Sequence, residues 1–118
     1  MNAPLEIERK FLIRMPNPSL LSEQPNVTVK QITQIYLLAE AGCTKRVRKS
    51  VMKDGISYRK TEKKRLSALT AIEEETELSE KEYTSLLSLA DPERKPIEKV
   101  RYTFPYEGHL LEIDIYPF

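Results

Sequence analysis

Hydrophobic and polar residues alternate along several short segments of this 118-residue chain, a pattern typical of β-strands with one buried face. Seven segments show it: 5–13, 32–38, 44–50, 56–63, 71–78, 97–104 and 109–116. The pairs Asp54-Gly55 and Glu107-Gly108 each separate two of these segments and predict turns. Between the first two segments, three prolines predict a loop with one helical turn around 19–23.

One segment changes to the spacing of a helix. Ser79 and Glu82 form the sequence signature of a capping box, in which each side chain binds the other residue's backbone N–H. Apolar residues then follow at helical spacing from Tyr83 to Ala90, and Asp91-Pro92 ends the helix. Five strands, a helix and two strands predict one domain over 1–118, with an α+β fold in which a mostly antiparallel sheet packs against one helix.

Charged residues stand two positions apart on six of the seven predicted strands. Because alternate side chains of a strand point to opposite faces, each such set lies on one face. The acidic members of this face are Glu6, Glu8, Glu73, Glu75, Glu112 and Asp114. The basic members are Lys10, Arg46, Arg48, Lys63, Lys99 and Arg101. Most of these strands carry a single sign of charge, which is unusual for a face that only meets water.

Two interpretations of this face remain open. An ordinary half-buried sheet would turn its polar face to solvent. If the sheet instead curls with the charged face inward, it forms a tunnel whose unpaired charges lose hydration unless they are paired, solvated or occupied. Arginine and lysine bind phosphate oxygens, and clustered carboxylates bind Mg²⁺. A tunnel lined by both signs therefore favours a polyphosphate bound together with its metal.

Composition narrows the function class. The net charge is +1, from 19 basic and 18 acidic residues, which argues against a nucleic-acid-binding protein recognised by its overall charge. One cysteine and one histidine exclude an internal disulfide and a classical zinc site, so any metal is expected to be oxygen-bound Mg²⁺ or Mn²⁺. Without a membrane-length apolar stretch or a signal peptide, we expect a soluble, cytoplasmic protein with no membrane partner.

The ordered motifs resemble those of the CYTH domain, also called the triphosphate tunnel metalloenzyme family. The family's first-strand motif Glu-x-Glu-x-Lys matches residues 6–10. Five further motifs follow in the family's order: Arg46-Val47-Arg48, Thr61-Glu62-Lys63, Glu73-Glu74-Glu75, Lys99-Val100-Arg101 and Glu112-Ile113-Asp114. The match covers nearly the whole chain, except that it ends before the family's C-terminal portion, which normally adds a last acidic strand.

This resemblance implies a fold and an activity. The family fold is a closed antiparallel β-barrel, a tunnel with a charged interior, of which seven strands are expected here. The basic residues would bind a triphosphate, the six acidic residues would hold Mg²⁺ or Mn²⁺, and Glu6, Glu8 and Lys10 would be catalytic. The reaction would be triphosphate hydrolysis, with inorganic triphosphate as the favoured substrate.

Other functions stay open. A partial tunnel could bind polyphosphate or a nucleotide without turnover, and the family also includes adenylate cyclases and thiamine triphosphatases. An unclosed sheet would expose its edge strands, so we also expect that two copies could pair through those edges.

Overall fold

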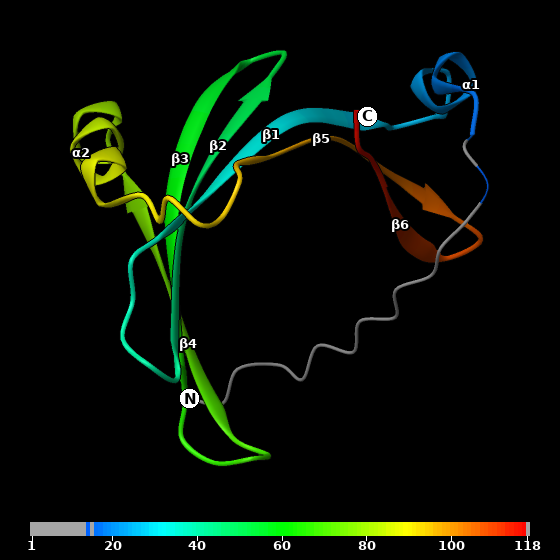
Figure 1. Cartoon of the computed structure of the whole chain (residues 1–118). Helices are drawn as coiled ribbons and strands as arrows, with labels where there is room; N and C mark the ends of the chain where they lie inside the picture. The colour runs from blue at the N-terminus through cyan, green and yellow to red at the C-terminus, as the bar shows by residue number, and fades with distance from the viewer. Residues whose placement is uncertain (1–13, 15, 118) are drawn as a thin grey trace.

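The computed structural model of the chain describes residue 14 and residues 16–117, and these residues form an antiparallel six-stranded sheet with short helices (Figure 1). The spatial order of the strands is β4-β3-β2-β1-β5-β6. The elements are α1 (Pro18–Ser22), β1 (Thr28–Leu37), β2 (Cys43–Met52), β3 (Gly55–Arg65), β4 (Ala71–Leu78), α2 (Glu80–Leu86), the 3₁₀ turn η1 (Leu87–Leu89), β5 (Ile97–Tyr106) and β6 (His109–Ile115).

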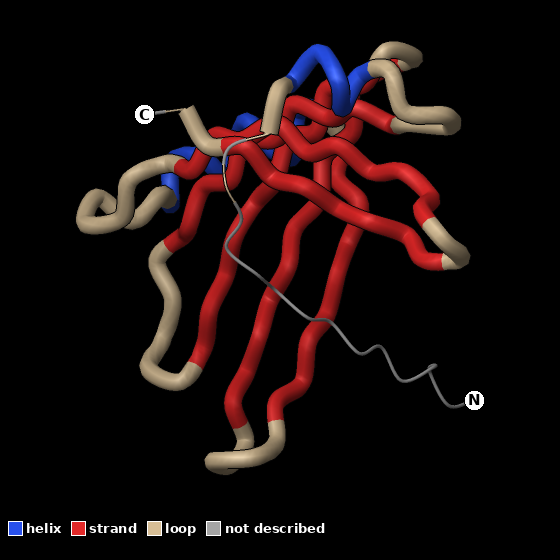
Figure 2. The backbone as a smooth tube through the Cα atoms, turned by 90° about the vertical axis from the view of Figure 1, so that its right-hand side faces the viewer, coloured by secondary structure: helices blue, strands red, loops and turns tan. Residues whose placement is uncertain are grey.

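The sheet curls into an open half-barrel, with β4 and β6 as its edge strands (Figures 1 and 2). Both helices lie outside the curve, on its convex side (Figure 1). The α+β class and the antiparallel sheet are therefore confirmed, whereas a closed seven-stranded barrel is not what the described residues form. The predicted strand at 5–13 lies outside the described residues.

Two apolar clusters hold the helices against the convex face of the sheet. In the first, Leu21 of α1 packs with Tyr102 and Phe104 of β5. In the second, Tyr83 of α2 packs with Val47 of β2, which has no exposed surface. Each strand contributes the side chains of one parity to these clusters, so the other parity is left for the concave face.

Most of the predicted boundaries agree with the observed elements, and the disagreements have physical causes. The strand predicted at 71–78 coincides with β4, and the helical turn predicted around 19–23 corresponds to α1. β1 begins at Thr28, four residues earlier than expected, because residues 28–34 pair with β5. The α-helix ends at Leu86 rather than continuing to Ala90, because Ala90 forms a bridge with Leu37 and the chain tightens into η1 before it.

The capping box predicted for α2 is present and supports a stability prediction. The Ser79 hydroxyl accepts a hydrogen bond from the Glu82 N–H at 3.1 Å, and the Glu82 carboxylate accepts one from the Ser79 N–H at 3.0 Å. We expect Ser79→Ala to lower the free energy of unfolding by about 0.5–2 kcal/mol, since it removes a capping acceptor. Urea denaturation measures this change, with Ser85→Ala on the same helix as the control. Equal stability of the two variants would contradict the prediction.

Candidate anion-binding face

The strand register places the predicted charged residues on one face of one sheet. Residues that stand opposite each other in neighbouring antiparallel strands share a face, and Arg48 stands opposite Gln34 of β1 and Arg59 of β3. Continuing across the sheet assigns the following predicted site residues to this same face: Arg46, Arg48, Lys63, Lys99, Arg101, Glu73, Glu75, Glu112 and Asp114. The two apolar clusters use the opposite parity, so this charged face is the concave one.

The charges of the face converge on Arg48 at its centre. Burial lowers the pKa of the Arg48 guanidinium, and the neighbouring positive charges of Arg46 and Arg101 lower it further. Glu75 and Asp114 act in the opposite direction, although they lie on the two opposite edge strands. A flat sheet would keep edge strands on either side of β2 too far apart to act together on one guanidinium. The curl is therefore what assembles this cluster.

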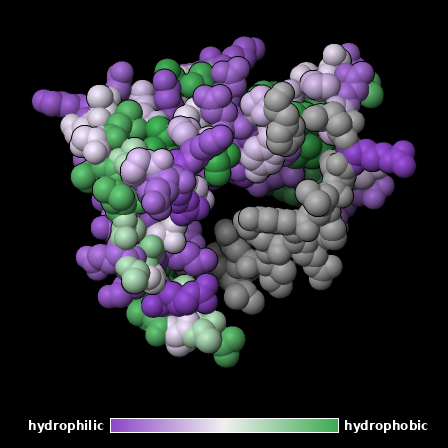
Figure 3. Space-filling view, in the orientation of Figure 1, coloured by the Kyte–Doolittle hydropathy of each residue, from purple (hydrophilic) through white to green (hydrophobic). Residues whose placement is uncertain are grey.

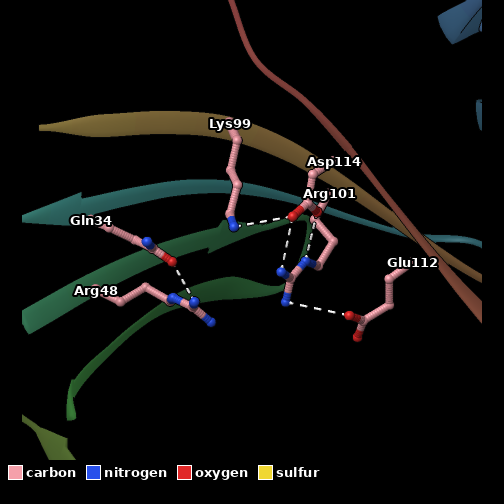
Figure 4. A network of polar contacts seen from close by, with 6 residues as sticks. All are labelled: Gln34, Arg48, Lys99, Arg101, Glu112 and Asp114. Carbon is pink, nitrogen blue, oxygen red and sulfur yellow. Dashed lines mark hydrogen bonds and ion pairs between the residues drawn. The ribbon is translucent and has the colours of Figure 1, made fainter. Parts of the chain in front are cut away.

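Asp114 binds two cations at the β5–β6 edge (Figure 4). Arg101 donates two hydrogen bonds to its carboxylate, from Nε at 2.8 Å and from Nη2 at 3.1 Å. The ammonium of Lys99, whose side chain is 8% exposed, lies 3.0 Å from Asp114 Oδ2. Arg101 also lies 3.7 Å from Glu112. A buried lysine is tolerated here because its charge is paired.

These contacts shift the pKa values of Asp114 and Arg101. Burial alone would raise the pKa of Asp114, but hydrogen bonds from Arg101 and Lys99 outweigh it and hold the pKa below its usual value. The hydrogen bond to Asp114 raises the pKa of Arg101. Asp114 and Arg101 are therefore both ionised at neutral pH.

On the other side of Arg48, a second set of ion pairs joins β3 to β4. Arg59 lies 3.2 Å from Glu75 and 3.9 Å from Glu77. Arg59 and Glu75 are about half exposed and Glu77 is largely exposed, so each pair adds little stability. The register also places Lys63 opposite Glu73 on the same face. Acidic residues of both edge strands thus flank a central group of cations.

The structure adds site residues that the sequence analysis did not select. A cavity of about 90 Å³ on the charged face is lined by Lys30, Ile32, Arg48, Ser50, Ser57, Arg59 and Arg101. Arg59 shares its parity with Lys63, so the alternation rule could have found it. Ser50 and Ser57 stand two positions from Arg48 and Arg59, so alternation places them on the same face. Lys30 has no charged residue two positions away, and its pairing with Arg101 brings it to the cavity.

Some donors of the central arginines have no acceptor among the described residues. Arg48 donates from Nη2 to the Gln34 side chain (Figure 4). The Nε atoms of Arg46 and Arg48 are buried and have no hydrogen-bond partner in the described part of the chain. A buried donor without an acceptor is destabilising, so these two groups lower the stability of the face.

The acidic residues are less well assembled than the basic ones. Glu73 and Glu75 lie on β4, whereas Glu112 and Asp114 lie on β6 at the other edge of the sheet. Within residues 14 and 16–117, no three acidic, histidine or cysteine side chains form a group that could hold a metal ion. The predicted catalytic residues Glu6, Glu8 and Lys10 lie outside the described residues. The donors present are carboxylate oxygens, which suit Mg²⁺ or Mn²⁺ in chemistry but do not form a complete ligand set here.

Comparison with known proteins gave no relatives: the chain matches no family model, no curated protein and no solved structure. None of the described helices is long and apolar enough to cross a bilayer.

The Asp114 network predicts a specific dependence of stability on pH. Asp114 has a lowered pKa in the folded chain, whereas an unfolded aspartate titrates near pH 3.9. Its contribution to stability is therefore complete above that value and is lost as the pH falls through the lower folded pKa. We expect the stability difference between wild type and Asp114→Asn to be largest at pH 7 and to shrink below about pH 4.

Urea denaturation at pH 7, 5, 4 and 3 measures this difference. Glu98→Gln, which removes one carboxylate from the convex face of β5, is the charge-matched control. A wild-type advantage over Asp114→Asn that grows on acidification would contradict the assigned ion pairs.

Proposed function

We propose that the charged face binds a triphosphate and that the chain hydrolyses it with Mg²⁺ or Mn²⁺, as a CYTH-like triphosphatase. The observation that carries this proposal is the convergence of Arg46, Arg48 and Arg101 on the concave face of the sheet. Three guanidiniums close enough to lower one pKa repel one another, and a polyanion placed among them removes that repulsion. Arginine binds phosphate oxygens in pairs, which gives orientation as well as affinity.

The size and chemistry of the cavity favour phosphate over a nucleoside. Its volume of about 90 Å³ is close to that of three water molecules at ~30 Å³ each, so it suits a single phosphoryl group, and a triphosphate would extend beyond it along the open face. Of the described residues that line it, all but Ile32 are cations or serines. Hydroxyl and guanidinium donors suit a phosphoryl group, and none of these described lining residues is an aromatic that could stack on a base. Inorganic triphosphate is therefore the substrate that we propose.

The metal requirement rests on the sequence motifs. Mg²⁺ or Mn²⁺ would supply further charge neutralisation for the phosphates and activate the attacking water. The described carboxylates do not form a ligand group on their own, so Glu6 and Glu8 would supply essential ligands of the metal site. Arg48, Arg101 and Lys99 would bind the phosphates and stabilise the charge that develops as the P–O–P bond breaks.

A phosphate-release assay tests the proposal. Inorganic triphosphate is supplied without metal and with about 5 mM Mn²⁺ or Mg²⁺. We expect metal-dependent release that is lost in Lys10→Ala, Glu8→Ala and Arg101→Ala and retained in Lys49→Ala, which alters the convex face of β2. Release without metal, or release that survives all three site variants, would overturn the proposal.

Binding without turnover is the second candidate, and one observation favours it. The described residues assemble cations on the face but no three-carboxylate metal group. If this function is correct, calorimetry will detect triphosphate binding that Arg48→Ala weakens, while no phosphate is released with either metal. If the chain neither binds triphosphate nor releases phosphate from it, the charged face is an ordinary sheet face that contacts solvent.

A further inference from the structure

The end of the β3–β4 hairpin extends away from the helices and from the rest of the sheet (Figures 1 and 2). Every residue from 63 to 77 is exposed, on both faces of the two strands. Leu69 at the turn has 98% of its surface exposed, and Leu66 beside it has 54%. We refer to residues 63–72 as the hairpin tip. It is an apolar apex at a corner of the sheet: β2 pairs with β3 as far as Lys64, so the turn beyond Arg65 is the part that projects. Neither the apolar clusters nor the charged face uses its leucines.

Backbone and side-chain hydrogen bonds fix the shape of this apex. Thr70 O accepts from the N–H groups of Leu66 at 2.9 Å and Ser67 at 3.1 Å. The Ser67 hydroxyl accepts from the N–H groups of Leu69 at 3.3 Å and Thr70 at 3.1 Å. Arg65 donates to Ala68 O at 3.2 Å. The turn is therefore well formed, and it holds Leu69 outward rather than folding it back onto the strands.

Charge is layered along the hairpin behind the apex. Lys63, Lys64 and Arg65 follow each other on β3, and alternation places their side chains on both faces of the hairpin. Glu73 on β4 stands directly opposite Lys63, whereas Lys64 and Arg65 stand opposite Ile72 and Ala71. From the tip inward, the order is therefore apolar residues, then Lys64 and Arg65, and then residues of both signs. Figure 3 shows hydrophobic colouring at the lower end of the molecule, with hydrophilic colouring above it.

We propose that the hairpin tip inserts into the surface of an anionic lipid bilayer. Leu66 and Leu69 would enter the boundary of the acyl region, and the three basic residues would lie among the negatively charged headgroups. Cations lie on both faces of the hairpin. A layer of anionic headgroups would surround an inserted hairpin and could therefore contact the cations of both faces. A protein groove would meet the hairpin from one side and would leave the cations of the other face unused.

This association is peripheral and uses a hairpin, so it requires no membrane-spanning helix. Its test is separate from that of the proposed function, because Leu66, Leu69 and Lys64 take no part in the charged face, although Lys63 belongs both to the tip and to that face. A few leucines with a few basic residues give reversible binding, which depends on both anionic lipid and salt. The hairpin would hold the open side of the half-barrel near the bilayer surface.

Co-sedimentation with vesicles tests the proposal. We expect the chain to bind anionic vesicles of phosphatidylcholine and phosphatidylserine in a ratio of about 70:30. It should not bind vesicles of phosphatidylcholine alone. The double variant Leu66→Ser/Leu69→Ser and the variant Lys64→Gln should each reduce the partition coefficient, the first by at least about tenfold. Raising the salt concentration to about 0.5 M should weaken wild-type binding.

The matched controls are Leu20→Ser, which changes a leucine of 59% exposure on α1, and Lys81→Gln on α2. Both should bind the anionic vesicles as wild type does. Because Leu69 is almost fully exposed, its replacement should leave the circular dichroism spectrum and triphosphate binding unchanged. Failure of the wild-type chain to bind anionic vesicles, or equal binding by the Leu66→Ser/Leu69→Ser variant, would overturn the proposal and would favour a protein partner for the tip.

Discussion

Arg48→Ala is expected to weaken the binding of inorganic triphosphate by about 30- to 140-fold. The change removes a guanidinium from the centre of the charged face, where it faces the cavity beside Arg59 and Arg101. Loss of hydrogen bonds between a charged donor and a charged ligand costs about 2–3 kcal/mol, which corresponds to this range. Isothermal titration calorimetry with inorganic triphosphate measures the change directly.

The neighbouring residue provides the control for this prediction. Lys49 follows Arg48 on β2 and points to the opposite, convex face, where it stands across from Tyr58. Lys49→Ala removes the same unit of charge from the same strand, so it separates a local contact from a general electrostatic effect. Affinities for triphosphate that fall equally in both variants would indicate that overall charge, rather than the concave face, determines binding.

Val47→Asp is expected to destabilise the chain by more than about 4 kcal/mol, enough to abolish most of the stability of a small domain. Val47 is fully buried on the convex face, in contact with the cluster that joins α2 to the sheet. Aspartate at this position would bury a carboxylate against Leu37 and Tyr83. Lys60 stands opposite on β3 but is already paired with Glu62, so it would have to give up that ion pair to reach the new carboxylate. Thermal denaturation followed by circular dichroism should show no cooperative transition, or a midpoint at least roughly 15 °C lower.

Ile56→Asp is the control for Val47→Asp. Ile56 shares the convex face, but 53% of its surface is exposed, at the start of β3. Its replacement by aspartate should lower the midpoint only slightly, because the new carboxylate keeps its hydration. A folded Val47→Asp variant with a midpoint near that of wild type would show that the convex face is not the core of this domain.

Alternation predicted the strands well because these strands bury one face and expose the other. β5 is the clearest case, since Val100, Tyr102 and Phe104 pack in an apolar cluster while Lys99 and Arg101 lie on the charged face. The early start of β1 could not be predicted, because residues 28–31 extend β1 through their pairing with β5, a contact between segments about 70 residues apart. The end of α2 was missed for a similar reason, since the bridge between Leu37 and Ala90 is a tertiary contact.

The same logic explains what could be predicted of the site. Parity alone placed Arg46, Arg48 and Arg101 on one face, because it needs no knowledge of the neighbouring strands. It could not reveal that Asp114 pairs with both Lys99 and Arg101, since that depends on the register of β5 with β6. Nor could it reveal the curl of the sheet, which brings Glu75 and Asp114 of the two edge strands into the surroundings of Arg48.

The acidic residues remain separate from each other because the curled sheet stays open between its two edge strands, β4 and β6. Glu75 and Asp114 both influence Arg48, yet they belong to the opposite edges of an open half-barrel. A central group of cations suits a polyanion, whereas the carboxylates on either side would repel its ends unless a bound cation lay between them. This arrangement is the physical basis of the proposed triphosphate function.

The most direct test of the concave face as a binding site is a titration of ¹⁵N-labelled protein with inorganic triphosphate, followed by nuclear magnetic resonance. We expect the largest amide shift changes at Lys30, Arg48, Ser57 and Arg101, on four different strands that meet at the cavity. Changes restricted to convex-face residues such as Lys49 and Lys64, or no saturable change at all, would contradict the account.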